Sequence, residues 1–130
     1  MPGKQQATQH GTSLEDQVAA LAEALGLKVE RKVKVGYRLW GRRRVIDLVL
    51  RKPGTDKILG VECKYQQVAG TAEEKILALL EDMKHWPIPG ILVIGGEGFS
   101  DKMRAYLLST GKVVEIAHLE EWLRLFFVLD

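Results

Sequence analysis

Three stretches in the first half of the chain have the residue pattern of β-strands, and they limit the possible folds more than any other feature of the sequence. They cover residues 27–35, 44–50 and 58–64. Residues 27–35 alternate between apolar and charged side chains, which predicts a half-exposed strand because successive side chains of an extended chain point to opposite faces. Residues 44–50 are more apolar and predict a more buried strand, and residues 58–64 predict a third strand. Residues 52–56 contain adjacent proline and glycine, so we expect a turn there and a hairpin between the second and third strands. The pattern predicts an antiparallel meander of three strands.

Apolar residues before and after this meander recur at the spacing of a helix. A first helix is expected to begin at Thr12, where Thr12 and Glu15 form a capping box, and a second helix begins with the same pattern at Thr71. The remaining elements are a strand at 91–94, a helix ending near residue 109, a strand at 113–117 and a helix at 119–128. This order predicts an α/β fold: a single domain with a mixed β-sheet, an αβββαβ core and a C-terminal helix-strand-helix.

The length of 130 residues fits one domain, which we expect to span residues 12–130 after a flexible N-terminal tail at residues 1–11. No apolar run approaches the roughly 18 residues that cross a bilayer, and the N-terminus is polar, so a cytoplasmic protein without a membrane partner is expected. One cysteine and three scattered histidines exclude an internal disulfide and a structural zinc site.

Charge is distributed unevenly. Residues 28–52 carry ten basic and two acidic residues, a net charge of +8, whereas the whole chain carries +2. A basic segment of this kind indicates a polyanionic partner, and the aromatic Tyr37 and Trp40 within it could stack on bases. The alternative is a solvated basic loop.

The third strand carries the residues with the most chemical meaning. Glu62 and Lys64 are two residues apart and share one side of the strand, together with Gln66 if the extended chain continues. A hairpin closed near residues 52–57 would place Asp47 opposite Glu62. Two adjacent carboxylates repel each other, which favours a divalent cation between them, and Mg²⁺ accepts one or two carboxylates. Lys64 would then stabilise charge on a phosphate.

Glu15 is expected to complete this patch. Its face of the first helix continues through the small residues Ala19 and Ala22, which would allow a close approach to the sheet. Two other Glu-x-Lys sequences, at 30–32 and 73–75, lack this context: the first has no upstream strand aspartate, and the second lies on a predicted helix, where residues two apart diverge. The alternative is a hairpin with incidental charges.

Asp47, fifteen residues before Glu62-Cys63-Lys64, preceded by a helical Glu15 and followed by a helix, resembles the pattern of the PD-(D/E)xK nuclease superfamily, the restriction-endonuclease-like fold. The resemblance covers about residues 12–95. The chain departs from that pattern in having isoleucine rather than proline before Asp47.

The resemblance implies an endonuclease that hydrolyses DNA with Mg²⁺, for which Mn²⁺ can substitute. It implies that Asp47, Glu62 and the backbone carbonyl of Cys63 bind the metal, that Lys64 is the catalytic lysine, and that Glu15 and Gln66 are accessory catalytic residues. The residues expected to contact DNA are Lys32, Lys34, Trp40, Arg42, Arg43, Arg44, Gln67 and Lys75. Lys75 could instead form a surface ion pair.

Restriction-like, homing-like and resolvase-like activities all fit this resemblance. A homodimer is expected for cleavage of both strands, because one active site cuts one strand at a time. The apolar C-terminal helix would pack in the core or, alternatively, form that dimer interface. A second hypothesis of a different class is a non-catalytic nucleic-acid-binding module or subunit with the nuclease fold.

Overall fold

The computed structural model describes residues 3–37, 41–66 and 73–130, and for residues 3–13, 73 and 74 it describes the backbone alone. The elements run in the predicted order. They are α1 (Gly3–Ala24), β1 (Lys28–Tyr37), β2 (Arg43–Arg51), β3 (Ile58–Tyr65), α2 (Glu73–Met83), β4 (Gly90–Gly95), α3 (Asp101–Ser109), β5 (Val113–Glu115), the 3-10 turn η2 (Ile116–His118) and α4 (Leu119–Phe126).

The strands form one mixed sheet in the order β1-β2-β3-β4-β5. The first three strands pair antiparallel, whereas β4 is parallel to β3 and β5 is parallel to β4. The turn between β2 and β3 closes where the sequence predicts it, since the Lys52 N–H donates to the carbonyl of Lys57 at 3.2 Å. The predicted α/β class with a mixed sheet is confirmed.

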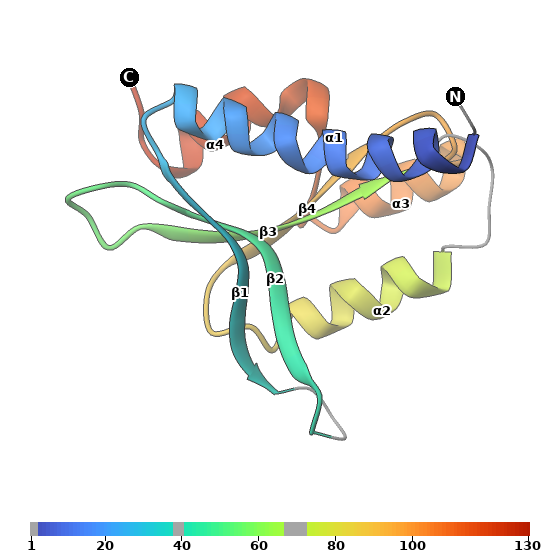
Figure 1. Cartoon of the computed structure of the whole chain (residues 1–130), viewed down its shortest axis with the longest axis horizontal. Helices are drawn as coiled ribbons and strands as arrows, with labels where there is room; N and C mark the ends of the chain where they lie inside the picture. Colours follow the sequence, from blue (N-terminus) through green and yellow to red (C-terminus); the bar gives the residue numbers. More distant parts are fainter. Residues whose placement is uncertain (1–2, 38–40, 67–72) are drawn as a thin grey trace.

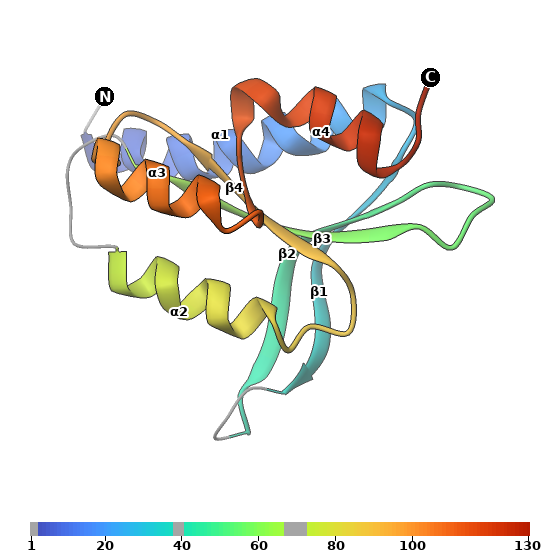
Figure 2. The same cartoon turned by 180° about the vertical axis from the view of Figure 1, so that it is seen from behind.

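Helices cover both faces of the sheet (Figures 1 and 2). Side chains of α1 and α4 pack on one face, against Leu48, Leu50, Val61, Ile91 and Val93. Side chains of α2 and α3 pack on the other face, against Ile46, Val49, Leu92 and Ile94. All six residues of β4 are buried, as its continuous apolar sequence predicts for a strand covered on both sides.

The apolar C-terminal helix packs in the core, as predicted. Leu119, Leu123 and Phe127 are fully buried, whereas Leu125 and Val128 remain exposed. Within the described part of the chain, no helix combines the length and apolar character that crossing a bilayer requires.

Two predicted boundaries are wrong. The first helix begins at Gly3, so residues expected in a flexible tail up to residue 11 are helical, and Thr12 lies inside α1 rather than at its start. Apolar periodicity marks only the part of a helix that packs on the sheet, whereas the good helix formers upstream, such as Gln5 and Ala7, allow the backbone to continue. The last strand ends at Glu115, because the chain turns into η2.

Arg44 joins the start of β2 to the end of α2. The residue is 9% exposed, and its guanidinium forms a bidentate ion pair with Asp82, with Nη2 donating at 3.0 Å and Nε at 3.1 Å. The indole N–H of Trp86 donates to the same carboxylate at 3.3 Å. The expectation that Arg44 contacts DNA is therefore wrong: its charge is already used to hold α2 against the sheet.

We predict that Arg44→Ala lowers the free energy of unfolding by about 3 kcal/mol, because it leaves the Asp82 carboxylate partly buried without its bidentate partner. Urea unfolding would measure this loss. The neighbouring Arg43 is exposed, and Arg43→Ala is the matched control with an expected change of about 0.5 kcal/mol or less. Equal losses in the two variants would contradict a structural role for Arg44.

Candidate active site

The candidate site lies where β2 and β3 separate. Their backbone pairing runs from Arg51 with Ile58 to Leu48 with Val61, and Asp47 and Glu62 are the next facing positions. Figure 1 shows β1 and β2 turning away from β3 beyond this point. The Asp47 carboxylate fills the gap, because its Oδ2 accepts a hydrogen bond from the Cys63 N–H at 3.3 Å. The prediction that Asp47 faces Glu62 is confirmed.

The backbone of Cys63 contributes a second group to this gap. In a paired strand, the N–H and C=O of one residue point to the same edge. The N–H of Cys63 points toward Asp47, so its carbonyl oxygen is directed to the same gap. The Cys63 thiol packs against the core on the α1 side, and burial raises its pKa well above the ordinary value.

Asp47 and Glu62 form a carboxyl pair with opposite electrostatic behaviour. Glu62 is only 8% exposed. This burial and the hydrogen bond to Asp47 raise the pKa of Glu62 to about 9. Burial also opposes ionisation of Asp47. Hydrogen bonds from Glu62, Lys32 and the Cys63 N–H outweigh it and lower the pKa of Asp47. The raised pKa of Glu62 and the lowered pKa of Asp47 both indicate that the metal-free site disfavours two full negative charges side by side.

Glu15 reaches the site from α1 through a lysine. The Lys32 ammonium lies 3.1 Å from Asp47 Oδ1 and 3.4 Å from Glu15 Oε2, so it bridges the two carboxylates. Hydrogen bonding to Asp47 raises the pKa of Lys32. The structure thus brings Glu15, Asp47 and Glu62 into one region, as the sequence predicts, and it adds the exposed Lys32, which pairs with Glu15 and Asp47 on the solvent side.

Lys64 faces a groove between the sheet and α2. This groove has a volume of about 420 Å³, and its lining residues are Arg43, Val45, Glu62, Lys64, Lys75, Ala78 and Leu79. Three cationic side chains therefore surround the opening onto Glu62. Arg43 also lies over the ring of the exposed Tyr37, 5.2 Å from the ring centroid. A groove with this charge fits a phosphodiester backbone.

Gln66 has a positioning role. Its Nε2 donates to the Gly98 carbonyl at 2.9 Å, and its own carbonyl accepts from the Gly98 N–H at 2.6 Å. Gly96 passes so close that a Cβ atom there would lie 2.4 Å from the Gln66 carbonyl oxygen, and its φ is +88°. These contacts tie the end of β3 to the loop after β4. The predicted catalytic role of Gln66 has no direct support in this arrangement.

The other predicted DNA-contacting residues divide into two groups. Lys34 and Arg42 are exposed, and Lys75 is exposed at the start of α2 beside the groove. Trp40 and Gln67 lie outside the described residues. Sequence reasoning missed the bridging position of Lys32. In the β1–β2 register Val33 pairs with Ile46 and Arg31 with Leu48, so that Lys32 falls opposite Asp47.

The donor set fits a small, oxygen-binding cation. Among the described residues, no three acidic, histidine or cysteine side chains converge closely enough to form a complete metal site. Mg²⁺ does not require one, because it binds through one or two carboxylates and keeps several waters. Asp47, Glu62 and the Cys63 carbonyl meet that requirement. The Lys32 ammonium already lies against Asp47, which shows that this position attracts a cation.

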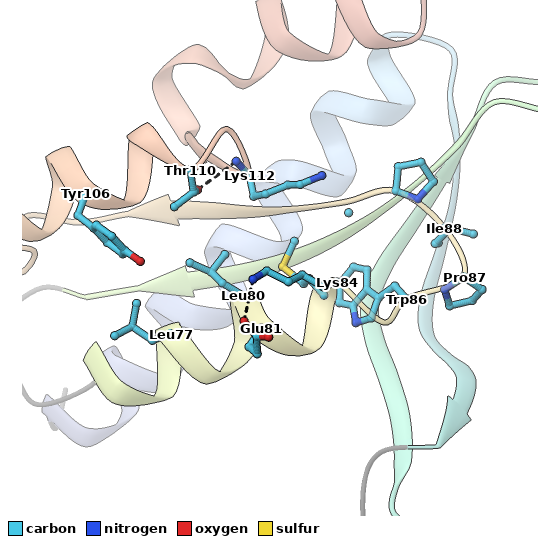
Figure 3. Close-up of a pocket in the computed structure, with 13 residues that line it drawn as sticks. Leu77, Leu80, Glu81, Lys84, Trp86, Pro87, Ile88, Tyr106, Thr110 and Lys112 are labelled. Carbon is cyan, nitrogen blue, oxygen red and sulfur yellow. Dashed lines mark hydrogen bonds and ion pairs between the residues drawn. The ribbon is translucent and has the colours of Figure 1, made fainter.

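A larger hollow lies elsewhere, between α2 and the segments around β4 and α3 (Figure 3). Its volume is about 920 Å³, and its lining includes Leu80, Trp86, Pro87, Ile88 and Tyr106. None of the acidic residues of the candidate site lines it. Its lining is mainly apolar, with Glu81, Lys84 and Lys112 as its charged residues.

Comparison with known proteins agrees with this geometry. A family model described as a PD-(D/E)XK nuclease superfamily domain matches residues 6–121, and the chain belongs to this superfamily. A crystal structure of a protein of unknown function, AF1548, matches with a TM-score of 0.54 and 21% sequence identity. The match covers 80% of this chain and 57% of that one, so the chain spans little more than half the length of this neighbour. The chain matches no curated protein.

We predict that the metal-free protein loses stability as the pH rises from about 5 to 9. The folded state keeps the Glu62 proton up to a pKa of about 9, whereas the unfolded chain releases it near 4.5, so the unfolded state binds fewer protons in this window. The slope is at most about 1.4 kcal/mol per pH unit. Urea unfolding in a chelator at several pH values measures it.

The matched control is Glu62→Gln, which keeps the shape of the side chain and removes its titration. This variant should lose the fall in stability between pH 5 and 9. The lowered pKa of Asp47 acts in the opposite direction and only below its ordinary value of 3.8, outside the window. If Glu62→Gln and the parent protein had the same pH slope, the proton would not reside on Glu62.

Proposed function

We propose that this protein is a Mg²⁺-dependent endonuclease that hydrolyses phosphodiester bonds in DNA. One observation carries the proposal: Asp47 and Glu62 form a carboxyl pair in the gap between β2 and β3, and Lys64 stands beside Glu62 at the edge of a basic groove. Membership of the nuclease superfamily supports the reaction class.

Each group has a role in this proposal. Asp47, Glu62 and the Cys63 carbonyl would hold the metal, which, when bound, supplies Lewis-acid activation of water and charge neutralisation at the phosphate. Lys64 shares the groove with Glu62, so its ammonium can donate to a phosphate oxygen and stabilise the negative charge that develops there. Arg43 and Lys75 hold the nucleic-acid backbone in the groove. Gln66 keeps the end of β3 in place.

The site variants Asp47→Asn, Glu62→Gln and Lys64→Met should each lower Mg²⁺-dependent cleavage of plasmid DNA about 100-fold or more, because each removes a charge used in the transition state. Gel analysis of the purified proteins measures cleavage, and circular dichroism checks that the fold is retained. Lys84→Ala is a suitable control, since Lys84 is exposed and pairs with Glu81 on α2. Full activity of Asp47→Asn would contradict the proposal.

The same assay separates the proposed nuclease from a non-catalytic binding subunit with this fold. A binding subunit would retard plasmid DNA on a gel without cutting it at any Mg²⁺ or Mn²⁺ concentration. Side-by-side incubation with a four-way junction, a linear duplex and a single strand would then distinguish a resolvase-like activity on branched DNA from a restriction-like or homing-like activity on duplex DNA.

Arg43→Ala and Lys75→Ala should weaken DNA binding to a similar extent on different sequences, because both side chains line the groove as phosphate-binding cations. Each variant should also reduce the slope of log affinity against log salt concentration by about 0.9. Fluorescence anisotropy with Ca²⁺ in place of Mg²⁺ measures both. Lys57→Ala, at the β2–β3 turn, is the control, and an equal effect there would contradict this path for the DNA.

We also propose a homodimer for cleavage of both strands. The exposed Leu125 and Val128 on and just after α4 offer an apolar surface for such a contact. Sedimentation of the protein with and without DNA would establish the oligomeric state.

A further inference from the structure

Lys32 adopts a backbone conformation that is unusual for its residue type. Its φ is +53°, within β1, where strand residues have strongly negative values. The ladder continues on both sides, since Arg31 pairs with Leu48 and Val33 pairs with Ile46. A left-handed conformation is unfavourable for a lysine and persists only where the surroundings impose it. The strain lies next to the carboxylates of the candidate site.

The side chain of Lys32 is accessible although its partners are not. Lys32 is 61% exposed at the side chain, whereas Glu15 is 15% and Asp47 is 24% exposed. The ammonium therefore covers the two carboxylates from the solvent side. Nothing encloses the lysine stem, so the head group can leave without disturbing the core.

Glu15 has a second cationic neighbour that stays in place. Arg31 Nη1 lies 3.6 Å from Glu15 Oε1 and 2.9 Å from Asp16 Oδ1. Departure of Lys32 would leave Glu15 partly neutralised by Arg31. Asp47 would lose its lysine partner and would keep only the hydrogen bonds from Glu62 and the Cys63 N–H.

We propose that Lys32 is a tethered cation that occupies the position between Glu15 and Asp47 and is displaced when a divalent metal binds. This inference rests on the proposed function, because it takes Asp47 as a metal ligand. An ammonium and a divalent cation repel each other and compete for the same carboxylate oxygens. Metal binding is then an exchange of cations, and Lys32 sets the metal affinity of the site as a positioning residue.

The test measures Mn²⁺ binding to the full chain without DNA, by the electron paramagnetic resonance signal of free Mn²⁺. Lys32→Asn removes the ammonium, and asparagine tolerates a positive φ. We expect this variant to bind Mn²⁺ about three- to tenfold more tightly, in line with the loss of one or two exposed ion pairs. Lys32→Gly provides a second variant that removes both the charge and the strain.

Two controls isolate the effect. Lys34→Asn removes the same charge from an exposed position two residues along β1, and it should change Mn²⁺ affinity less than twofold. Lys32→Arg retains the positive charge and should bind Mn²⁺ as the parent protein does. A gain in affinity for Lys32→Asn that Lys34→Asn does not share supports the exchange.

The exchange is overturned if Lys32→Asn and Lys32→Gly bind Mn²⁺ no more tightly than Lys34→Asn, or if the parent protein and both variants bind none. Its failure is separable from failure of the nuclease proposal, because binding is measured without DNA. If the parent protein cleaves DNA but Lys32→Asn and Lys32→Gly bind Mn²⁺ no more tightly than Lys34→Asn, only the cation exchange is contradicted. If Lys32→Asn binds Mn²⁺ more tightly but the parent protein does not cleave DNA, only the nuclease proposal is contradicted.

Discussion

The hydrogen bond from the Cys63 N–H to the Asp47 carboxylate determines how the rest of the site is arranged. A backbone ladder would normally continue between β2 and β3 at this point. The side chain of Asp47 replaces it, which holds the two strands apart and still satisfies the buried N–H. The separation opens a space into which Glu62 and the Cys63 carbonyl can turn. A short aspartate at this position therefore serves the fold and the chemistry together.

The pair at this gap is unfavourable in the absence of a cation, and the fold compensates for it in two ways. Burial and Asp47 raise the pKa of Glu62, which favours its neutral form, and Lys32 and Arg31 bring positive charge from β1 to Asp47 and Glu15. Both reduce the negative charge of the site, and a bound divalent cation can take over that role. The basic segment at residues 28–52 thus serves at least three purposes: Lys32 balances the acidic site, Arg44 anchors α2 and Arg43 lines the groove.

The sequence predicted the parts of the site that depend on local rules. Period-two alternation and a short turn determine which residues of β2 and β3 face each other, so the opposition of Asp47 and Glu62 could be predicted. The position of Lys32 could not, because the β1–β2 register shifts between Lys34 and Tyr37 and Lys32 itself has a positive φ, and the alternation of residues shows neither irregularity. Arg44 also could not be distinguished from Arg43. Its partner Asp82 lies 38 residues away on α2, and the sequence does not show which face of α2 packs beside β2.

The adjacency of Arg43 and Arg44 limits how this surface can change during evolution. One of these side chains lines the groove, and the next holds a helix to the sheet, with Asp47 four residues beyond Arg43 on the same strand. Loss or gain of one residue in β2 would exchange their positions and would also remove Asp47 from the gap. Substitutions at Arg43 can therefore change which ligands the groove binds without affecting the fold. A change in the length of β2 would instead disturb the groove, the Arg44–Asp82 ion pair and the position of Asp47 at the same time.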